Sequence, residues 1–375
     1  MTAWEERVQT GAHPVAYRMM RLICASGPVR RVPRVGVVVS DPVLARQVLM
    51  DSDTFTKTGP GSPSDLWTPV LGPSVLLNME GDAHTRLRRK LSGLFTPGYV
   101  RDLCERVLTV PLARLREDLA DGREVDLVRV VQDCAGAVIC ELVGLPADRV
   151  AEAYSRGTAI TSMVRLGRPR LTDRQIRHAR TELGGLTAPA IRAYRAGDPA
   201  TVPGRMRELG LTEEEAHGAV GAFVLTGTET LVSYLPRLVA LCHDTGVAVT
   251  PSNLDSVVVE GLRYTVPSPV MLRSVARAGS VGGVAVRPGD RIVIATLFAA
   301  RGRAPFDPAR PADPDIRQLW FGAGAHFCLG APLARAEIDA VLRALAPTDR
   351  LTVTSRAVAK RVLIPGYSRL MIRSL

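Results

Sequence analysis

The sequence predicts a mainly α-helical fold with a minor β region, built as a single domain over residues 1–375. Apolar residues recur at three- and four-residue spacing through most of the stretch from Asp82 to Gly210, which is the period of amphipathic helices. The apolar run that follows Thr212 is too long for a surface helix and indicates a buried helix that crosses the core. Short β-branched segments occur near the start and after Thr265, with no internal repeats and no linker typical of a domain boundary.

The first predicted elements are a helix, a hairpin and a second helix. The helix covers Val15–Ala25, and the β-branched segment after it predicts a hairpin over residues 27–41. Asp41 or Ser40 can cap the N-terminus of the next helix, which we expect over Pro42–Met50.

The remaining elements follow from local signals. The Gly-, Pro- and Ser-rich stretch Thr58–Leu77 predicts a long loop, and a loop of that length in a compact domain is usually functional. Thr212 and Glu215 form a capping-box pattern at the start of the buried helix. After Thr265 we expect short strands, then a last helix that follows Cys328, and strand-like material at the end of the chain.

Composition and charge exclude several classes of protein. Apolar residues make up 46% and charged residues 23%, as in an ordinary soluble globular protein. No segment approaches the roughly 18 uninterrupted apolar residues of a membrane helix, and the charged residues within 1–14 do not fit a secretory signal. We therefore expect a cytoplasmic protein without a membrane partner. We also expect a monomer.

The net charge is +11, and almost all of the basic residues are arginines. Nucleic-acid binding is one explanation of such a charge. The basic residues are spread along the whole chain, however, with no polybasic tail and no aromatic interleaving. We expect no nucleic-acid partner; an arginine-rich composition or a docking face for an acidic protein explains the charge better.

One of the six cysteines differs from the others. None belongs to a CxxC pair, which argues against a zinc ribbon or a redox dithiol. Glycines surround Cys328, whereas the other five lie in aliphatic helical contexts and fit small buried apolar residues. Those five are Cys24, Cys104, Cys134, Cys140 and Cys242.

The segment FGAGAHFCLGAPLAR, from Phe321 to Arg335, carries the most information. Its glycines permit unusual backbone angles and allow a flat cofactor to approach the main chain. Cys328 lies just before a predicted helix start, where free N–H groups lower the pKa of a thiol and favour the metal-binding thiolate. His326 and Arg335 are placed to meet a negatively charged cofactor edge. A buried cysteine in a tight turn is the alternative, but about nine positions match at fixed spacing.

This segment resembles the haem-binding loop of the cytochrome P450 superfamily, whose pattern is F-G-x-G-x-H-x-C-x-G-x-x-L-A-R, and every specified position is matched. The similarity to soluble bacterial members, of the actinobacterial type, extends from about Gly27 to the end. It implies the P450 fold, with a long central helix over the haem, and haem b (iron protoporphyrin IX) as the cofactor. Cys328 is then the iron ligand, with cofactor contacts from Phe321, Gly322, His326 and Gly330.

Glu260 and Arg263 have the family's E-x-x-R form. Residues three apart share one face of a helix, so the two side chains can pair. By resemblance they lock the segment beside the haem loop, with Arg310 as a candidate third member. Such a pair alone is usually an ordinary surface pair, but its position ahead of the cysteine loop supports the resemblance to the family.

His84 and Arg88, at i and i+4 on one helix face, match the family's H-x-x-x-R. A His/Arg pair suits the two haem propionates through charge-assisted hydrogen bonds, and Arg273 is a further candidate. Basic residues on the other side of the same helix could receive an acidic ferredoxin-type electron donor or could simply be solvated. They are Arg86, Arg89 and Lys90.

The predicted buried helix contains a segment, 226–230, that resembles the family's oxygen-activation element A-G-x-[DE]-T. Gly and Thr are poor helix formers, and a threonine hydroxyl can bond the backbone and bend the helix. By resemblance Thr230 holds water beside the iron and Glu229 relays protons from bulk solvent. The sequence departs from the pattern at Thr226, where alanine is usual, and at Leu231, where many relatives have threonine; capping or solvation by Thr and Glu is the alternative.

The resemblance also implies a substrate site. Trp67, Thr226 and Val270 belong to stretches that line the substrate in this family, and these stretches are mainly aliphatic here. The region from Arg165 to Arg195 is rich in arginine, which suits an anionic substrate or an acidic carrier protein bearing the substrate. Solvated helix faces explain the same arginines.

These observations predict a monooxygenase that inserts one oxygen atom from O₂ into a small organic substrate by hydroxylation or epoxidation. We expect a role in natural-product tailoring, with electrons from a ferredoxin and its reductase. A peroxide-driven peroxygenase is one alternative, disfavoured by Glu229 and Thr230. The other is a non-catalytic haem-thiolate sensor or ligand-binding protein, which has no use for that pair.

Overall fold

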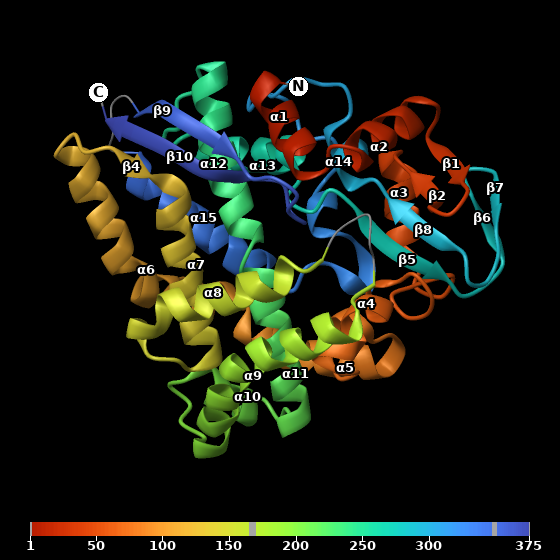
Figure 1. The fold of residues 1–375 in the computed structure, drawn as a ribbon, viewed down its shortest axis with the longest axis horizontal. Helices are drawn as coiled ribbons and strands as arrows, with labels where there is room; N and C mark the ends of the chain where they lie inside the picture. Colours follow the sequence, from red (N-terminus) through yellow and green to blue (C-terminus); the bar gives the residue numbers. More distant parts are fainter. Residues whose placement is uncertain (1, 165–169, 347–350, 375) are drawn as a thin grey trace.

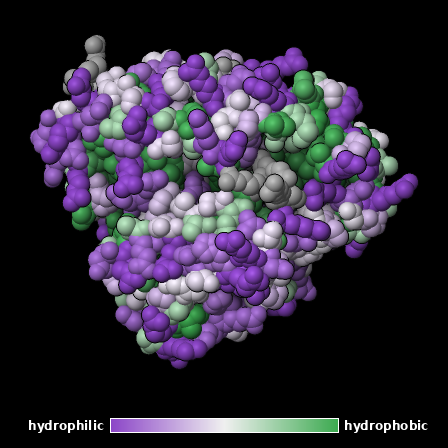
Figure 2. Space-filling view, in the orientation of Figure 1, coloured by the Kyte–Doolittle hydropathy of each residue, from purple (hydrophilic) through white to green (hydrophobic). Residues whose placement is uncertain are grey.

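The computed structural model describes residues 2–164, 170–346 and 351–374. Helices dominate and the sheets are small, as the sequence predicts. Figure 1 shows the sheet that contains β5 and β8 on one side of the molecule and the helices α6 to α11 gathered on the other. No helix in these ranges is long and apolar enough to cross a membrane, and hydrophilic side chains cover most of the face in Figure 2.

The N-terminal part agrees with the predicted helix, hairpin and helix. The side chain of Asp41 accepts a hydrogen bond from the N–H of Leu44 and caps α3, while Pro42 occupies the first helical turn. A further helix, α1, lies ahead of the predicted ones. The elements are α1 (Ala3–Ala12), α2 (Ala16–Ala25), β1 (Val29–Val32), β2 (Gly36–Val39), α3 (Pro42–Met50) and β3 (Phe55–Thr56).

Five strands from distant parts of the chain form the main sheet, in the order β1-β2-β8-β5-β3. β2 pairs in parallel with β8 (Arg291–Ile294), which pairs antiparallel with β5 (Met271–Val275). This register places Arg273 opposite Ile292. The hairpin of β6 (Gly279–Val281) and β7 (Val284–Val286) extends from the sheet.

The prediction of a continuous loop over Thr58–Leu77 is wrong. α4 (Pro63–Leu71) and a 3₁₀ turn, η1 (Leu76–Asn78), occupy much of it. Pro63 fits the first helical turn, and the apolar face of α4 packs in a separate cluster with α8, α9 and α11. This tertiary packing outweighs the poor helix propensity of Gly, Pro and Ser.

The helical body agrees with the predicted periodicity between Asp82 and Gly210. It consists of α5 (Gly81–Leu91), α6 (Pro97–Ala120), α7 (Leu127–Val143), α8 (Val150–Thr161), α9 (Asp173–Ala196) and α10 (Val202–Glu208). The 3₁₀ turns η2 (Ser92–Leu94) and η3 (Ala147–Arg149) connect parts of it.

The predicted central helix is divided into two. α11 (Glu213–Gly227) begins with the predicted capping box between Thr212 and Glu215. α12 (Thr230–Thr245) continues it after a break at residues 228–229, and both helices are largely buried. The helix therefore crosses the core as predicted, and its interruption lies within the segment 226–230 that resembles the oxygen-activation element.

The last third of the chain contains the helices and 3₁₀ turns on either side of Cys328 in the sequence. They are α13 (Leu254–Thr265), α14 (Thr296–Arg301), η4 (Leu319–Phe321), η5 (Gly324–His326) and α15 (Ala331–Leu345). β4 (Val125–Asp126), β10 (Tyr367–Ser374) and β9 (Leu351–Val358) form a three-stranded sheet, so the predicted strand-like end is confirmed.

Candidate functional site

The loop that carries Cys328 folds back on itself before α15. The backbone N–H of Cys328 donates to the carbonyl of Phe321 at 2.9 Å. Gly322 and Gly324 have φ of 80° and 66°, in the left-handed region that favours glycine. A Cβ on Gly324 would also lie 2.8 Å from the carbonyl oxygen of Leu49. Glycine at 324 is thus required both by backbone conformation and by the close approach of α3.

The sulfur of Cys328 faces an internal space. Its side chain is accessible to solvent. The surrounding protein nevertheless desolvates the thiol and raises its pKa. Both observations are expected for a side chain at the wall of a cavity inside the protein. The N–H groups of Gly330 and Ala331 donate to the sulfur and lower the pKa, as do the charges of Lys57 and Arg88. The expected net lowering is wrong for the free thiol because burial is the larger effect. A bound metal deprotonates a coordinating thiol in any case.

Two histidines predicted to contact the cofactor lie together beside this loop. The ring centroids of His84 and His326 are 4.2 Å apart. His84 is 2% exposed, and its Nε2 has no hydrogen-bond partner among the described residues. Burial lowers the pKa of His84 to about 4. His326 has a partner, since its Nε2 lies 2.7 Å from Oε2 of Glu80.

Three further basic side chains complete the cluster. Arg88 of α5 donates from Nη2 to the carbonyl of Phe327 at 2.7 Å and so ties its helix to the cysteine loop. Burial lowers the pKa of Arg273, on β5, to about 10. Burial, and then the charge of Arg273, lower the pKa of Lys57 to about 7, while the charges of Glu80 and Cys328 raise it. His84, Arg88, Arg273 and His326 are thus brought together as predicted, and Lys57 and Glu80 join them unpredicted.

The residues of this cluster fit a haem. The unpartnered Nε2 of His84 marks a buried position that needs a polar partner. The charges of Glu80, Arg88 and Arg273 all act on the Lys57 amine, so basic groups outnumber the Glu80 carboxylate, and this excess suits two additional carboxylates. Cys328, on the adjoining loop, is exposed, and its sulfur would be the ligand of the haem iron. We call Lys57, His84, Arg88, Arg273 and His326 the propionate cluster.

Phe95 connects the cysteine loop with the central helix. Its ring centroid is 5.4 Å from that of Phe223 on α11. A Cβ on Gly330 would lie 3.9 Å from Phe95 and 4.0 Å from the sulfur of Cys328. Thr226, one helical turn beyond Phe223, is exposed although its neighbours Val224 and Thr228 are buried. The part of α11 near Thr226 therefore borders a space close to the cysteine loop.

Threonine hydroxyls bond the helix backbone beside the break between α11 and α12. The hydroxyl of Thr226 donates to the carbonyl of Ala222 at 2.8 Å, and that of Thr230 donates to the carbonyl of Thr226 at 3.0 Å. Such bonds bend helices, in agreement with the predicted distortion. Oε1 of Glu229 accepts from Thr158 at 3.0 Å and from Tyr154 at 3.5 Å, and burial raises the pKa of this carboxyl.

Glu260 and Arg263 form a buried pair, with Nε of Arg263 2.6 Å from Oε2 of Glu260. Nε of Arg310, the candidate third member, lies 3.9 Å from Oε1 of the same glutamate. Oε1 also accepts the N–H of Asp307 at 2.9 Å, and Arg263 donates to the carbonyl of Pro305 at 3.0 Å. The pair therefore fixes the segment that leads toward the cysteine loop.

The three predicted substrate residues occupy different environments. Trp67 is 9% exposed and packs with Val70, Leu71 and Leu183, so it belongs to the cluster that holds α4 on α9. Val270 is half-buried just before β5, and Thr226 is exposed.

Two predicted roles need correction. Arg335 does not meet the cofactor edge, because its guanidinium pairs with Asp255 and, at 3.0 Å, with Asp339. Lys90 is less available to a docking face than predicted, because its Nζ lies 2.8 Å from Oε2 of Glu215. Arg86 and Arg89 on the same helix are exposed.

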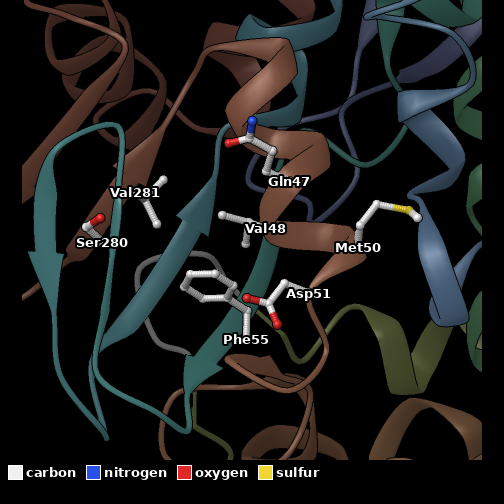
Figure 3. Close-up of a pocket in the computed structure, with 7 residues that line it drawn as sticks. All are labelled: Gln47, Val48, Met50, Asp51, Phe55, Ser280 and Val281. Atoms are coloured by element: carbon white, nitrogen blue, oxygen red, sulfur yellow. The ribbon is translucent and has the colours of Figure 1, made fainter.

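A pocket of about 440 Å³ lies elsewhere, between α3, β6 and the start of β3. Figure 3 shows Val48, Phe55 and Val281 around it, with Met50 pointing away. It includes no predicted site residue. Its lining consists of Gln47, Val48, Met50, Asp51, Phe55, Ser280 and Val281.

Known proteins resemble this chain over most of its length. A family model described as Cytochrome P450 matches residues 253–346. Erythromycin C-12 hydroxylase of Saccharopolyspora erythraea is 32% identical over 334 residues, which are 82% of this chain and 80% of that protein. The solved structure of a mutant of P450 EryK in complex with erythromycin B is 26% identical, covers 97% of both chains and has a TM-score of 0.79. That of P450BioI with an acyl carrier protein, at 19% identity, 100% coverage of both chains and a TM-score of 0.82, shows the fold alone.

The fold, the cysteine loop and the basic cluster define a haem-thiolate protein, and this degree of identity over most of the chain places it in the cytochrome P450 family. It is accordingly a cytochrome P450 monooxygenase with a haem cofactor.

Proposed function

We propose that the enzyme carries haem b and inserts one oxygen atom from dioxygen into a small organic substrate, by hydroxylation or epoxidation, during natural-product tailoring. The observation that carries this proposal is the accessible Cys328 sulfur, flanked by the propionate cluster and adjoining the interrupted helix α11–α12. The erythromycin C-12 hydroxylase that it resembles acts on a natural product.

Haem bound through the Cys328 thiolate supplies the chemistry of dioxygen activation. The N–H groups of Gly330 and Ala331 hold the sulfur in place and temper its donation of electron density. The propionate cluster would bind the two haem propionates. The hydrogen bond from Arg88 to the carbonyl of Phe327 fixes the position of this cluster relative to the cysteine loop.

Proton supply falls to Glu229 and Thr230. The hydroxyl of Thr230 is held by the carbonyl of Thr226 and remains able to accept a hydrogen bond from water on the distal side. Glu229 lies in a buried environment that favours its protonated form, which makes it a general acid. Thr226 adds a polar group to the same space and so restricts which substrate atoms approach.

We propose a ferredoxin with its reductase as the electron donor. The exposed Arg86 and Arg89 suit an acidic partner, and Lys90 contributes less because it pairs with Glu215. Electron transfer should then slow as the salt concentration rises.

A second candidate concerns delivery of the substrate on an acidic carrier protein. Arg174, Arg177 and Arg180 are exposed on α9, and Arg180 contacts α4 through the carbonyl of Pro69 at 2.8 Å. Arg165 and Arg168 of the predicted arginine-rich region lie outside the described residues. Titration of the haem spectrum with a free acyl compound and with the same acyl group on a carrier protein distinguishes the two modes; a carrier-bound substrate binds more tightly, and salt removes the advantage.

We also propose that the enzyme works as a cytoplasmic monomer. The free cysteines among the described residues suit a reducing compartment.

The experiment that tests the proposed function measures product formed under ¹⁸O₂, with a surrogate ferredoxin and NADPH, over a panel of natural-product substrates. We expect one labelled oxygen atom in the product and a strong loss of coupling in Thr230→Ala. Turnover with peroxide alone, at a rate that Thr230→Ala does not change, favours the peroxygenase. Ligand-dependent spectra without product from any donor favour the sensor or ligand-binding protein.

A further inference from the structure

Helix α8 packs directly on the break between α11 and α12. A Cβ on Gly157 of α8 would lie 2.3 Å from Oγ1 of Thr228, which is completely buried. Thr228 in turn donates to the carbonyl of Val224 at 2.6 Å, so it cannot move aside without losing that bond. Figure 1 shows α8 crossing the chain where α11 gives way to α12. Glycine in the middle of α8 therefore permits an unusually close approach of the two elements.

This approach brings two hydroxyls of α8 onto Glu229. Thr158 and Tyr154, one residue after and three residues before Gly157, both direct their hydroxyls at the same carboxyl oxygen, Oε1. Among the described residues, none provides a hydrogen bond to Oε2. Tyr154 also contacts Gln132 of α7, which connects the group to the next helix.

The groups that face Glu229 are neutral. The charged side chains of α8 nearest in sequence, Glu152 and Arg156, pair with each other at 3.0 Å, and Arg156 also pairs with Glu182 of α9 at 3.1 Å. No cation on α7, α8 or α9 acts on the carboxyl; burial raises its pKa, and the hydroxyls of Thr158 and Tyr154 lower it. The hydroxyls thus orient the acid without forcing it to ionise.

We propose that Tyr154 and Thr158 are positioning residues for Glu229, which hold its carboxyl in the helix break by Oε1 and leave Oε2 free to carry the transferable proton. The inference rests on the proposed function, because it assigns Glu229 the role of proton donor. In the step itself the O–H bond at Oε2 breaks and a new O–H bond forms on a water molecule on the distal side. The two hydroxyls then stabilise the carboxylate until it regains a proton from bulk water, so no electrons are gained or lost.

Infrared spectroscopy of the haem-loaded enzyme tests the position of the carboxyl without turnover. The difference spectrum between wild type and Glu229→Gln identifies the C=O band of the protonated carboxyl. Thr158→Val and Tyr154→Phe each remove one donor while preserving shape, and each should move that band to higher frequency. Thr158→Ser keeps the hydroxyl and should restore the wild-type position.

Matched controls lie on the same and the next helix. Thr161→Val removes a hydroxyl of α8 that bonds the carbonyl of Thr158, and Tyr194→Phe removes one of α9 that bonds the carbonyl of Leu211. Neither should move the band. A band unmoved in both Thr158→Val and Tyr154→Phe, or moved equally in the controls, would overturn the inference.

Coupling of electron use to product formation separates this inference from the function on which it rests. We expect the fraction of NADPH lost as hydrogen peroxide to rise about two- to tenfold in Thr158→Val, the factor given by one neutral hydrogen bond, and further in Glu229→Gln. If Glu229→Gln couples like wild type, the proposed role of Glu229 is wrong, whatever the α8 variants do to the band. If it uncouples while Thr158→Val and Tyr154→Phe couple fully with an unmoved band, the role stands and the positioning residues are wrong.

Discussion

Lys57 is a member of the propionate cluster whose pKa is lowered by burial and by its basic neighbours. The residue is half-buried, but its amine is buried near Arg273, Glu80, Cys328 and Arg88, and this burial lowers the pKa of the amine to about 7. Since an added carboxylate would favour its charged form, Lys57→Met should weaken haem retention about tenfold, as for the loss of one hydrogen bond to a charged group. The rate of haem transfer to excess apomyoglobin measures this.

Lys360, one of the chain's few other lysines, supplies the control because it is exposed near the end of the chain. Lys360→Met should release haem at the wild-type rate. Equal release from Lys57→Met and wild type would remove Lys57 from the propionate cluster.

Glu337, on the helix α15 that follows the cysteine loop, should make the stability of the protein depend on pH. Burial raises the pKa of this carboxyl, on α15, to about 8. Between the unfolded pKa near 4.5 and this value the folded state binds a proton that the unfolded state lacks, so this group makes stability fall as pH rises through that range. Glu337→Gln removes the titration and should gain on the order of 3 kcal/mol relative to wild type between pH 5 and pH 8.

Urea unfolding of the haem-loaded protein, followed by circular dichroism at both pH values, measures the gain. The exposed Glu105 of α6, replaced by Gln, serves as the matched control. The prediction fails if Glu337→Gln differs from wild type by the same free energy at pH 5 and pH 8.

Residue spacing predicts those site residues that lie together in one short segment of the sequence. The cysteine loop, His84 with Arg88 and Glu260 with Arg263 follow from fixed spacing, because backbone geometry brings such residues together. Lys57 and Glu80 meet His326 through contacts between distant segments, and no spacing rule marks them. The rarity of lysine in this arginine-rich chain was the one available signal for Lys57.

At the scale of elements, the packing of α8 on the interrupted helix gives a stability prediction. In Gly157→Ala the new methyl group meets the hydroxyl of Thr228 at 2.3 Å, and overpacking of this kind costs about 1–3 kcal/mol. The free energy of unfolding, from chemical denaturation, measures the loss.

Gly184→Ala, in the middle of α9, is the matched control because a Cβ there meets nothing within 4 Å. It should stabilise the helix by up to about 1 kcal/mol, since alanine is the better helix former. A Gly157→Ala protein as stable as Gly184→Ala would show that the two elements do not pack as described.

Elements with regular periodicity were predicted with nearly correct bounds, α2, α3 and the capped start of α11 among them. The helix α4 was missed because its Gly-, Pro- and Ser-rich surroundings suggest a loop, and its stability comes from α9 and α11. The break after Gly227 was predicted as a bend from its Thr and Gly residues, but the contact with α8 that accompanies it depends on tertiary packing.

At the scale of the whole molecule, a buried ion pair connects the start of the chain with the central helix. Glu5 of α1 pairs with Arg237 of α12, and their side chains are 5% and 0% exposed. Arg237 also donates to the carbonyls of Pro365 and Thr265, so three distant segments meet at this side chain. Glu5→Ala leaves a buried charge without its counter-ion and should cost about 3–5 kcal/mol of unfolding free energy.

Glu6 provides the comparison in the same helix, because its pair with Arg21 is exposed. Glu6→Ala should change stability by less than about 1 kcal/mol, the usual value for surface pairs. Equal effects of the two substitutions, measured by denaturant unfolding, would contradict a structural role for α1.

We propose that Cys328 ligates haem iron as a thiolate. The absorption spectrum of the reduced protein with carbon monoxide tests it most directly, with Cys328→Ser beside wild type and Cys24→Ser as the control. We predict a Soret band at the position typical of thiolate ligation in wild type and Cys24→Ser, and its absence in Cys328→Ser. A wild-type protein that binds haem without this band, or a Cys328→Ser protein that keeps it, would contradict ligation by Cys328.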